Sequence, residues 1–132
     1  MSQNQKLAII IASEEYEKSH VASMIASVAA VSGVDVSIFV TMNAVYNYLK
    51  ETVAKKNFTG GKMYQTIKEK KATMFYDLFD QAKMLGGLKI YVCSMVMDIL
   101  GIKKEDLLDI VDDHLGLAAF LGIMEGAETI TF

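Results

Sequence analysis

The single cysteine of the chain, Cys93, is the side chain best suited to covalent chemistry. It stands where the apolar run 88–92 ends and the segment 94–100, which has a helical pattern, begins. A sulfur atom at the start of a helix lies beside unpaired backbone N–H groups, and the helix dipole there lowers the pKa of a thiol. The position therefore predicts a reactive thiolate. The alternative is that Cys93 is buried as a small apolar side chain.

Two absences narrow the chemistry of this thiol. The chain has no second cysteine, so it has no Cys-x-x-Cys pair and no resolving partner for an intramolecular disulfide. It also has no proline. Thioredoxin folds, including those of true peroxiredoxins, place a cis-proline opposite the reactive thiol, and a cis bond without proline is costly. A dithiol oxidoreductase and a thioredoxin-fold peroxiredoxin are therefore set aside.

Other polar side chains follow apolar runs elsewhere in the chain. If the runs 7–11, 34–40 and 88–92 are parallel strands, their carboxyl ends meet at one edge of the sheet, where ligands bind in such folds. The residues predicted to line the site around Cys93 are Ser13, Glu14, Tyr16, Thr41, Asn43, Ser94 and Met95. For the acids 14, 15 and 17 the favoured alternative is stabilisation of a helix N-terminus, and for Met95 it is core filling.

The elements that must position these residues alternate between strand and helix. The three apolar runs are followed by a weaker strand near 110–114 and a β-branched strand over 128–132. Between them, apolar residues recur at helical spacing, and the expected helices cover about 14–31, 41–50, 73–85, 94–100 and 117–124. This alternation predicts a single α/β domain over residues 1–132 with a parallel sheet covered on both faces.

The segment 52–72 stands apart because it is rich in lysine and only weakly periodic. Six lysines lie between residues 55 and 71, with Glu69 as the only acid in that stretch. The segment predicts a long, solvated loop or excursion, and the alternative is a local attraction for small anions or an acidic partner.

Composition excludes several classes of protein. The net charge is −3, and all thirteen basic residues are lysines, so the side chain best suited to reading nucleic acids is missing. No apolar run is long enough to span a bilayer, and the N-terminus lacks the layout of a signal peptide, so we expect a soluble, cytoplasmic protein. A reducing compartment also suits a lone cysteine.

Signatures of metal and nucleotide sites are also missing. His20 and His114 lack metal-ligand spacing with Cys93 and the neighbouring acids, so no metal is expected. Neither glycine fingerprint for nucleotides is present, which disfavours a dinucleotide or triphosphate enzyme. A flavin-type ligand held by plain loops stays open.

The residues around Cys93 resemble a known family. The stretch 89–107, Lys-Ile-Tyr-Val-Cys-Ser-Met-Val-Met-Asp-Ile-Leu-Gly-Ile-Lys-Lys-Glu-Asp-Leu, is similar to the DsrE/DsrF/DsrH-like family, in the branch labelled "peroxiredoxin family" by name only. The runs 36–40, 116–121 and 129–132 are similar too, so the resemblance covers nearly the whole chain. The chain departs from that branch because it lacks prolines in the loop before the third helix. The resemblance therefore implies no particular contact for that loop.

The resemblance implies both a fold and an activity. The fold is a three-layer α/β/α sandwich with a five-stranded parallel sheet in the order 4-3-2-1-5, assembled into homo-oligomers. The activity is sulfur transfer, in which Cys93 holds a persulfide or accepts sulfane sulfur from a small TusA-like or rhodanese-like protein, without a cofactor. The lone cysteine agrees with this implication, because a carrier passes its cargo to a partner and needs no resolving cysteine.

Three hypotheses from different classes stay open. The first is a cytoplasmic sulfur carrier or sulfurtransferase that uses Cys93 and accepts sulfur from a partner protein or from small sulfur anions. The second is a flavodoxin-like module that binds a small ligand at the sheet edge. The third is a non-catalytic subunit of an oligomer, in which Cys93 is only packed.

Overall fold

The computed structural model describes residues 5–132, which form a parallel sheet surrounded by helices. The sheet has five strands in the order β4-β3-β2-β1-β5, and every neighbouring pair is parallel. The predicted fold class and strand order are confirmed. The strands are β1 (Lys6–Ile11), β2 (Asp35–Val40), β3 (Leu88–Cys93), β4 (Asp113–Leu115) and β5 (Glu128–Thr131).

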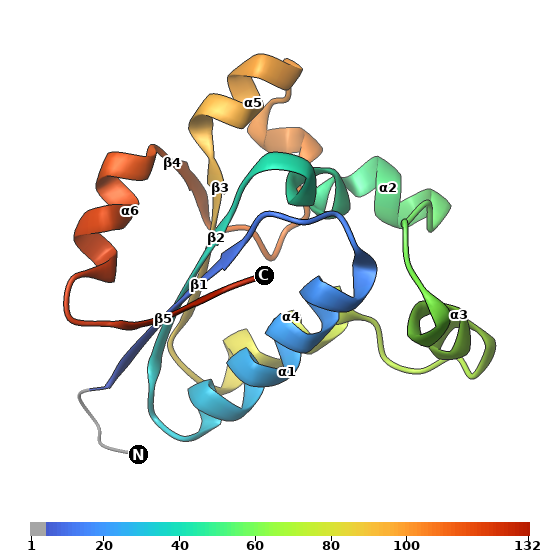
Figure 1. Ribbon diagram of the computed structural model, residues 1–132, viewed down its shortest axis with the longest axis horizontal. Coiled ribbons are helices and arrows are strands. Elements are labelled where there is room, and N and C mark those ends of the chain that lie inside the picture. Colours follow the sequence, from blue (N-terminus) through green and yellow to red (C-terminus); the bar gives the residue numbers. More distant parts are fainter. Residues whose placement is uncertain (1–4) are drawn as a thin grey trace.

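The helices lie on both faces of this sheet. α1 (Tyr16–Val31) and α4 (Phe75–Leu85) pack side by side on one face, and α6 (Leu117–Met124) lies on the other (Figure 1). α6 is attached through Phe120, whose ring stacks on Phe39 of β2 with the centroids 4.8 Å apart. α5 (Ser94–Leu100) follows β3 directly.

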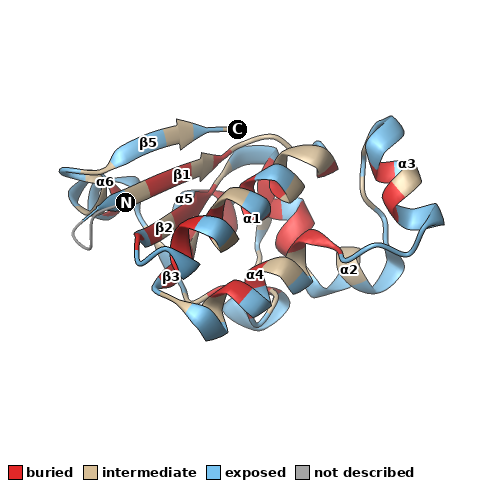
Figure 2. Cartoon of the chain, turned by 90° about the horizontal axis from the view of Figure 1, so that it is seen from below, coloured by how far each residue is buried: buried red, intermediate tan, exposed pale blue. Residues whose placement is uncertain are grey.

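The core lies mainly between the central strands and the two long helices. Figure 2 shows buried residues concentrated on β1, β2, β3 and the inner sides of α1 and α4, whereas β5 is largely exposed. Central strands of a parallel sheet are covered on both faces, which is why their sequences are nearly continuous apolar runs. The runs therefore identified the three central strands correctly.

The segment between β2 and α4 differs from its prediction. The helix expected from Thr41 to about Lys50 is a 3-10 helix, η1 (Met42–Tyr48), and the loop expected over 52–72 contains α2 (Lys50–Lys55) and α3 (Lys62–Glu69). Only two residues of α3 are buried, Tyr64 and Ile67. Two buried positions in a helix of eight residues give too short a periodic signal for a helix to be recognised.

A carboxylate attaches α3 to the body of the domain. Glu17, in the first turn of α1, accepts the N–H groups of Gly61 (2.8 and 3.1 Å to its two oxygens) and Tyr64 (3.1 Å). These N–H groups at a helix start have no partner within the helix, so an acceptor from another element satisfies them. Burial of Glu17 alone would raise its pKa, but the Tyr64 and Gly61 N–H groups outweigh it, and the pKa is lowered.

The end of α4 approaches α1 closely at Gly86. A Cβ atom at this position would lie 2.5 Å from the backbone carbonyl oxygen of Ala30. Only a residue without a side chain lets the chain pass there before it enters β3. The approach therefore helps to set where β3 begins.

Candidate functional site

Cys93 occupies the strand-to-helix junction predicted for it. It is the last residue of β3 and the N-terminal flanking residue of α5, and its Cα partner on the neighbouring strand β4 is Leu115. The residue is 6% exposed. The thiol is thus held at the carboxyl edge of the sheet and is largely covered by its surroundings.

A polar pair lies directly beside the cysteine. Ser94 Oγ is 3.0 Å from Nδ1 of His114, which lies on β4. With the ring proton on Nε2, Nδ1 accepts the serine hydroxyl, and Nε2 faces Asp113 Oδ1 at 3.8 Å. The pKa of the Asp113 carboxyl is lowered by the His114 backbone N–H and then by the Lys104 ammonium, whose Nζ is 3.7 Å away. Serine, imidazole and carboxylate therefore form a chain of polar groups that begins at Ser94, the residue after Cys93.

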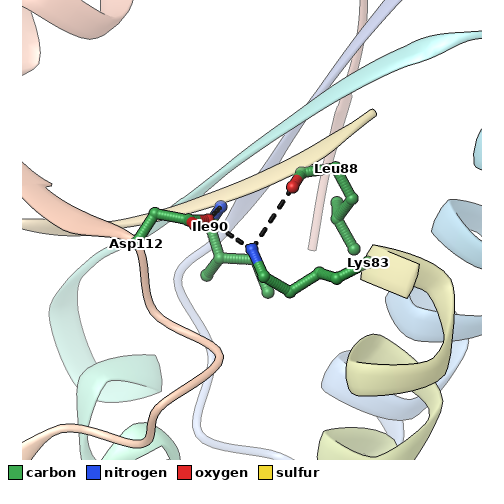
Figure 3. Close-up of polar contacts among 4 residues, drawn as sticks. All are labelled: Lys83, Leu88, Ile90 and Asp112. Carbon is green, nitrogen blue, oxygen red and sulfur yellow. Dashed lines mark hydrogen bonds and ion pairs between the residues drawn. The ribbon is translucent and has the colours of Figure 1, made fainter. Parts of the chain in front are cut away.

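The position of His114 depends on a contact just before β4. Asp112 Oδ2 accepts the N–H of Ile90 on β3 (2.8 Å) and binds Lys83 Nζ (2.5 Å), while the Asp112 N–H donates to the Ile90 carbonyl (2.8 Å). Lys83 Nζ also donates to the Leu88 carbonyl at 3.3 Å (Figure 3). Asp112 thus closes a ring of hydrogen bonds with Ile90 and places His114 opposite Val92, one residue before Cys93.

A small cavity adjoins this polar pair. Its volume is about 280 Å³, and its lining includes Ser94, Met97, Asp98, Lys103, Lys104 and His114. Two lysines and two exposed acids, Asp98 within the lining and Asp113 beside it, leave its charge mixed. The cavity offers hydrogen-bond donors and the His114 imidazole, and Ser94, the residue after Cys93, is part of its lining.

Three of the predicted lining residues lie near the same edge. Met95, in the first turn of α5, is 67% exposed and is a surface residue, so core filling does not describe it. Thr41 directly follows Val40, which pairs with Val92, so Thr41 and Cys93 leave neighbouring strands at the same level. Asn43 lies exposed in η1.

Ser13 and Glu14 lie at the end of β1, on the far side of β2 from β3. Strands are spaced about 4.8 Å apart, so the ends of β1 and β3 are separated by about 10 Å. Ser13 Oγ accepts the Glu15 N–H at 3.1 Å, and the Glu14 carbonyl accepts the Asn47 side-chain amide at 2.9 Å. Glu14 lines a separate polar cavity of about 260 Å³. The structure does not bring these two residues to the thiol.

Tyr16, which the sequence predicts at the sheet edge, lies in the core. Its side chain is fully buried, and its ring packs against Phe58, Tyr64 and Phe75. The hydroxyl accepts the Phe75 N–H at 3.1 Å and lies 3.0 Å from His20 Nδ1. Burial raises the pKa of Tyr16 to about 12. An aromatic ring of this size gains more from the core than from the sheet edge, and its hydroxyl finds partners there.

Sequence reasoning missed three members of the site. His114, Asp113 and Lys104 were either rejected as metal ligands or given no role, and nothing in their spacing connects them to residue 93. They meet the cysteine because β4 pairs with β3, a contact between distant parts of the chain. The strand predicted near 110–114 was the one sequence signal that could have brought His114 to the edge of the sheet.

Residues 5–132 hold neither a metal-binding cluster nor a membrane-spanning helix. Within that range, no group of three His, Cys, Asp or Glu side chains is arranged to hold a metal ion. In the same part of the chain, no helix has the length and apolar character needed to cross a bilayer.

Comparison with known proteins gives both a family and a fold. The DsrE/DsrF-like family matches residues 5–132. An uncharacterized protein of Bacillus subtilis (strain 168), YrkE, is 27% identical over 150 aligned positions, which cover 93% of each chain. Among solved structures, the YchN protein of E. coli superposes with a TM-score of 0.66 at 18% identity, over 97% of this chain and 99% of its own. MTH1491 of Methanobacterium thermoautotrophicum, a protein of unknown function, superposes with a TM-score of 0.57 at 17% identity, over 98% and 100%.

Proposed function

Because the chain belongs to the DsrE/DsrF-like family, we propose that it is a sulfur-transfer protein whose Cys93 holds sulfane sulfur as a persulfide. The observation that carries this proposal is the position of the thiol: the lone cysteine ends β3 at the carboxyl edge of a parallel sheet, beside the Ser94 and His114 pair. That edge is where reacting groups gather in open α/β sheets.

The transfer needs no external oxidant. The Cys93 thiolate attacks the outer sulfur of a donor persulfide, a new S–S bond forms on Cys93, and the donor's S–S bond breaks to release a thiolate. With thiosulfate as the donor, the leaving group is sulfite. In both cases the outer sulfur atom of the donor is transferred to Cys93 without net oxidation or reduction. A second cysteine is therefore not required.

In this proposal, the neighbouring Ser94 and His114 side chains move the proton during the exchange. In the proposed exchange, the His114 imidazole takes a proton through Ser94 when the thiol ionises and returns it to a leaving thiolate. The low exposure of Cys93 restricts the approach of bulk reagents and favours a donor that docks on the surrounding surface. A small TusA-like or rhodanese-like protein carrying a persulfide would suit this arrangement, as would a small sulfur anion.

We also propose that the protein works in the cytoplasm as a homo-oligomer. A reducing compartment keeps a lone thiol available. Both α1 and α4 expose large apolar side chains, such as Val28 at 64% and Met84 at 74%. Light scattering should give a mass above that of the 14.6 kDa chain at micromolar concentration, and a monomer there would contradict the assembly.

Mass spectrometry tests the role of Cys93. The reduced protein is treated with thiosulfate, tetrathionate or polysulfide, and the intact mass is measured before and after a reducing agent is added. We expect a reducible, sulfur-containing adduct on the wild type and none on Cys93→Ser. Ser94→Ala is the matched variant, which keeps the thiol and should form the adduct more slowly, with an altered pH profile of the rate.

Two results would contradict the sulfur-carrier hypothesis or favour another one. If the wild type stays unmodified by every donor, and Cys93 in the native protein also resists alkylation, the carrier hypothesis is lost and a packed cysteine remains. A ligand released on denaturation would instead support the small-ligand module.

A further inference from the structure

A second cavity lies far from Cys93 in the chain, between α3, its following turn and the start of α4. Its volume is about 490 Å³. Pockets for small molecules commonly have volumes of 300 to 1,000 Å³. Its lining includes Lys56, Ile67, Lys68, Lys71, Met74 and Tyr76. None of these residues belongs to the site around the cysteine.

The charge around this cavity is unbalanced. Three lysines line it against one acid, Asp77, and within residues 5–132 none of these four side chains takes part in an ion pair. Lys68 Nζ lies 4.7 Å from the ring centroid of Tyr64. Gathering like charges without counter-ions raises the local positive potential and attracts anions.

The backbone that carries the lysines is held in place. Lys56 and Lys71 follow the ends of α2 and α3, and both adopt left-handed backbone conformations, with φ of 50° and 51°. The buried Tyr64 hydroxyl donates to the Lys56 carbonyl at 3.2 Å, and the Lys71 N–H donates to the Lys68 carbonyl at 3.1 Å. Since Glu17 also anchors the start of α3, the walls of the cavity are preformed.

The cavity also has an apolar wall. Ile67 and Met74 are each only 8% exposed, so the faces they present to the cavity belong to well-packed side chains. The half-buried ring of Tyr76 stacks against Phe58, with the planes 25° apart. A flat apolar group placed on this wall would lie next to the three ammonium groups.

We propose that this cavity is a second ligand site, which takes a small organic phosphate: the phosphate between Lys56, Lys68 and Lys71, and an aromatic body against Tyr76 and Met74. Lysine ammonium groups bind phosphate as point charges without a fixed fork geometry. The volume of about 490 Å³ suits a small molecule better than an extended polymer. The apolar wall distinguishes the ligand from a bare inorganic anion. This inference does not rest on the chemistry of Cys93.

Isothermal titration calorimetry at low ionic strength tests the site, with phenyl phosphate and inorganic phosphate as the two probes. We expect the wild type to bind phenyl phosphate more tightly than inorganic phosphate. The double variant Lys68→Gln/Lys71→Gln should lose at least about tenfold in affinity for phenyl phosphate, because two charge-assisted contacts disappear. Tyr76→Leu should remove the preference for phenyl phosphate over inorganic phosphate.

The matched control is Lys62→Gln/Lys70→Gln, which changes the net charge equally, at the first residue of α3 and at the residue after its end, and lies outside the cavity lining. Its affinity should stay within about threefold of the wild type, since it alters only the long-range field. Equal weakening by the two double variants would overturn the site in favour of a diffuse charge effect. Absence of phenyl phosphate binding at millimolar concentration would also overturn it, as would binding of an acidic peptide alone.

Discussion

Replacing Asp112 should show how strongly the ring of hydrogen bonds before β4 holds the edge of the sheet. In Asp112→Ala, the Ile90 N–H loses its acceptor and Lys83 loses its counter-ion. An amide left without a partner costs about 1 to 3 kcal/mol. The side chains of Lys83 and Asp112 are 20% and 27% exposed, so water can hydrate the lysine, and the charge contributes at most about 1 kcal/mol.

The expected loss in the free energy of unfolding is therefore about 3 kcal/mol for Asp112→Ala. Asp112→Asn keeps an oxygen that can accept the Ile90 N–H and removes only the charge, so it should lose about 1 kcal/mol. Asp109→Ala is the control, because Asp109 is almost fully exposed and its ion pair with Lys50 is 3.7 Å long. That variant should change stability by less than about 0.5 kcal/mol.

Urea denaturation of the three variants measures these differences. Hydrogen exchange adds a local measurement, since the amides of Asp113–Leu115 should exchange faster in Asp112→Ala than in Asp112→Asn. Equal destabilisation of Asp112→Asn and Asp112→Ala would contradict the role of Asp112 as acceptor of the Ile90 N–H. A loss of less than about 1 kcal/mol in Asp112→Ala would contradict it too, because that is the lower bound set by an amide without a partner.

Two further predictions concern backbone approach and pH. Gly86→Ala places a Cβ 2.5 Å from the Ala30 carbonyl oxygen, so thermal unfolding should show a loss of about 2 kcal/mol or more, whereas Gly122→Ala, with open space around it, should not destabilise. Because the folded-state pKa of Glu17 is lowered, its stabilising effect is complete above the ordinary carboxyl pKa and declines as the pH falls through the folded-state value. Denaturation from pH 7 to pH 3 should thus show Glu17→Gln less stable than wild type near neutrality, with the gap closing in acid; a gap independent of pH would contradict this role.

The predictable part of the fold is the part with a continuous local signal. The runs 7–11, 34–40 and 88–92 are mostly apolar and mostly buried, as is typical of central strands, and their alternation with helices predicts parallel pairing. β4 was expected near 110–114 and occupies Asp113–Leu115. It begins later because Asp112 engages Ile90 through its side chain before regular pairing starts.

The predictable part of the site is likewise its local part. The junction at Cys93 follows from a strand that runs directly into a helix, and Ser94 comes with it. His114 enters through the pairing of β4 with β3, which no spacing rule reports. For Tyr16, a hydroxyl shortly after a strand end suggests a position at the sheet edge. The contacts of its ring with Phe75 and Tyr64, which lie far away in the sequence, place it in the core instead.

The lengths of the outer strands have a consequence for how copies of the protein can meet. β4 has three residues and β5 has four, whereas each inner strand has six. A short edge strand offers few unpaired backbone N–H and C=O groups to a strand of another molecule. Natural proteins use short edge strands to prevent uncontrolled edge-to-edge association. In the proposed homo-oligomer, we therefore expect contacts through helices or sheet faces. Sheet extension, the route to open-ended fibres, is disfavoured by the architecture.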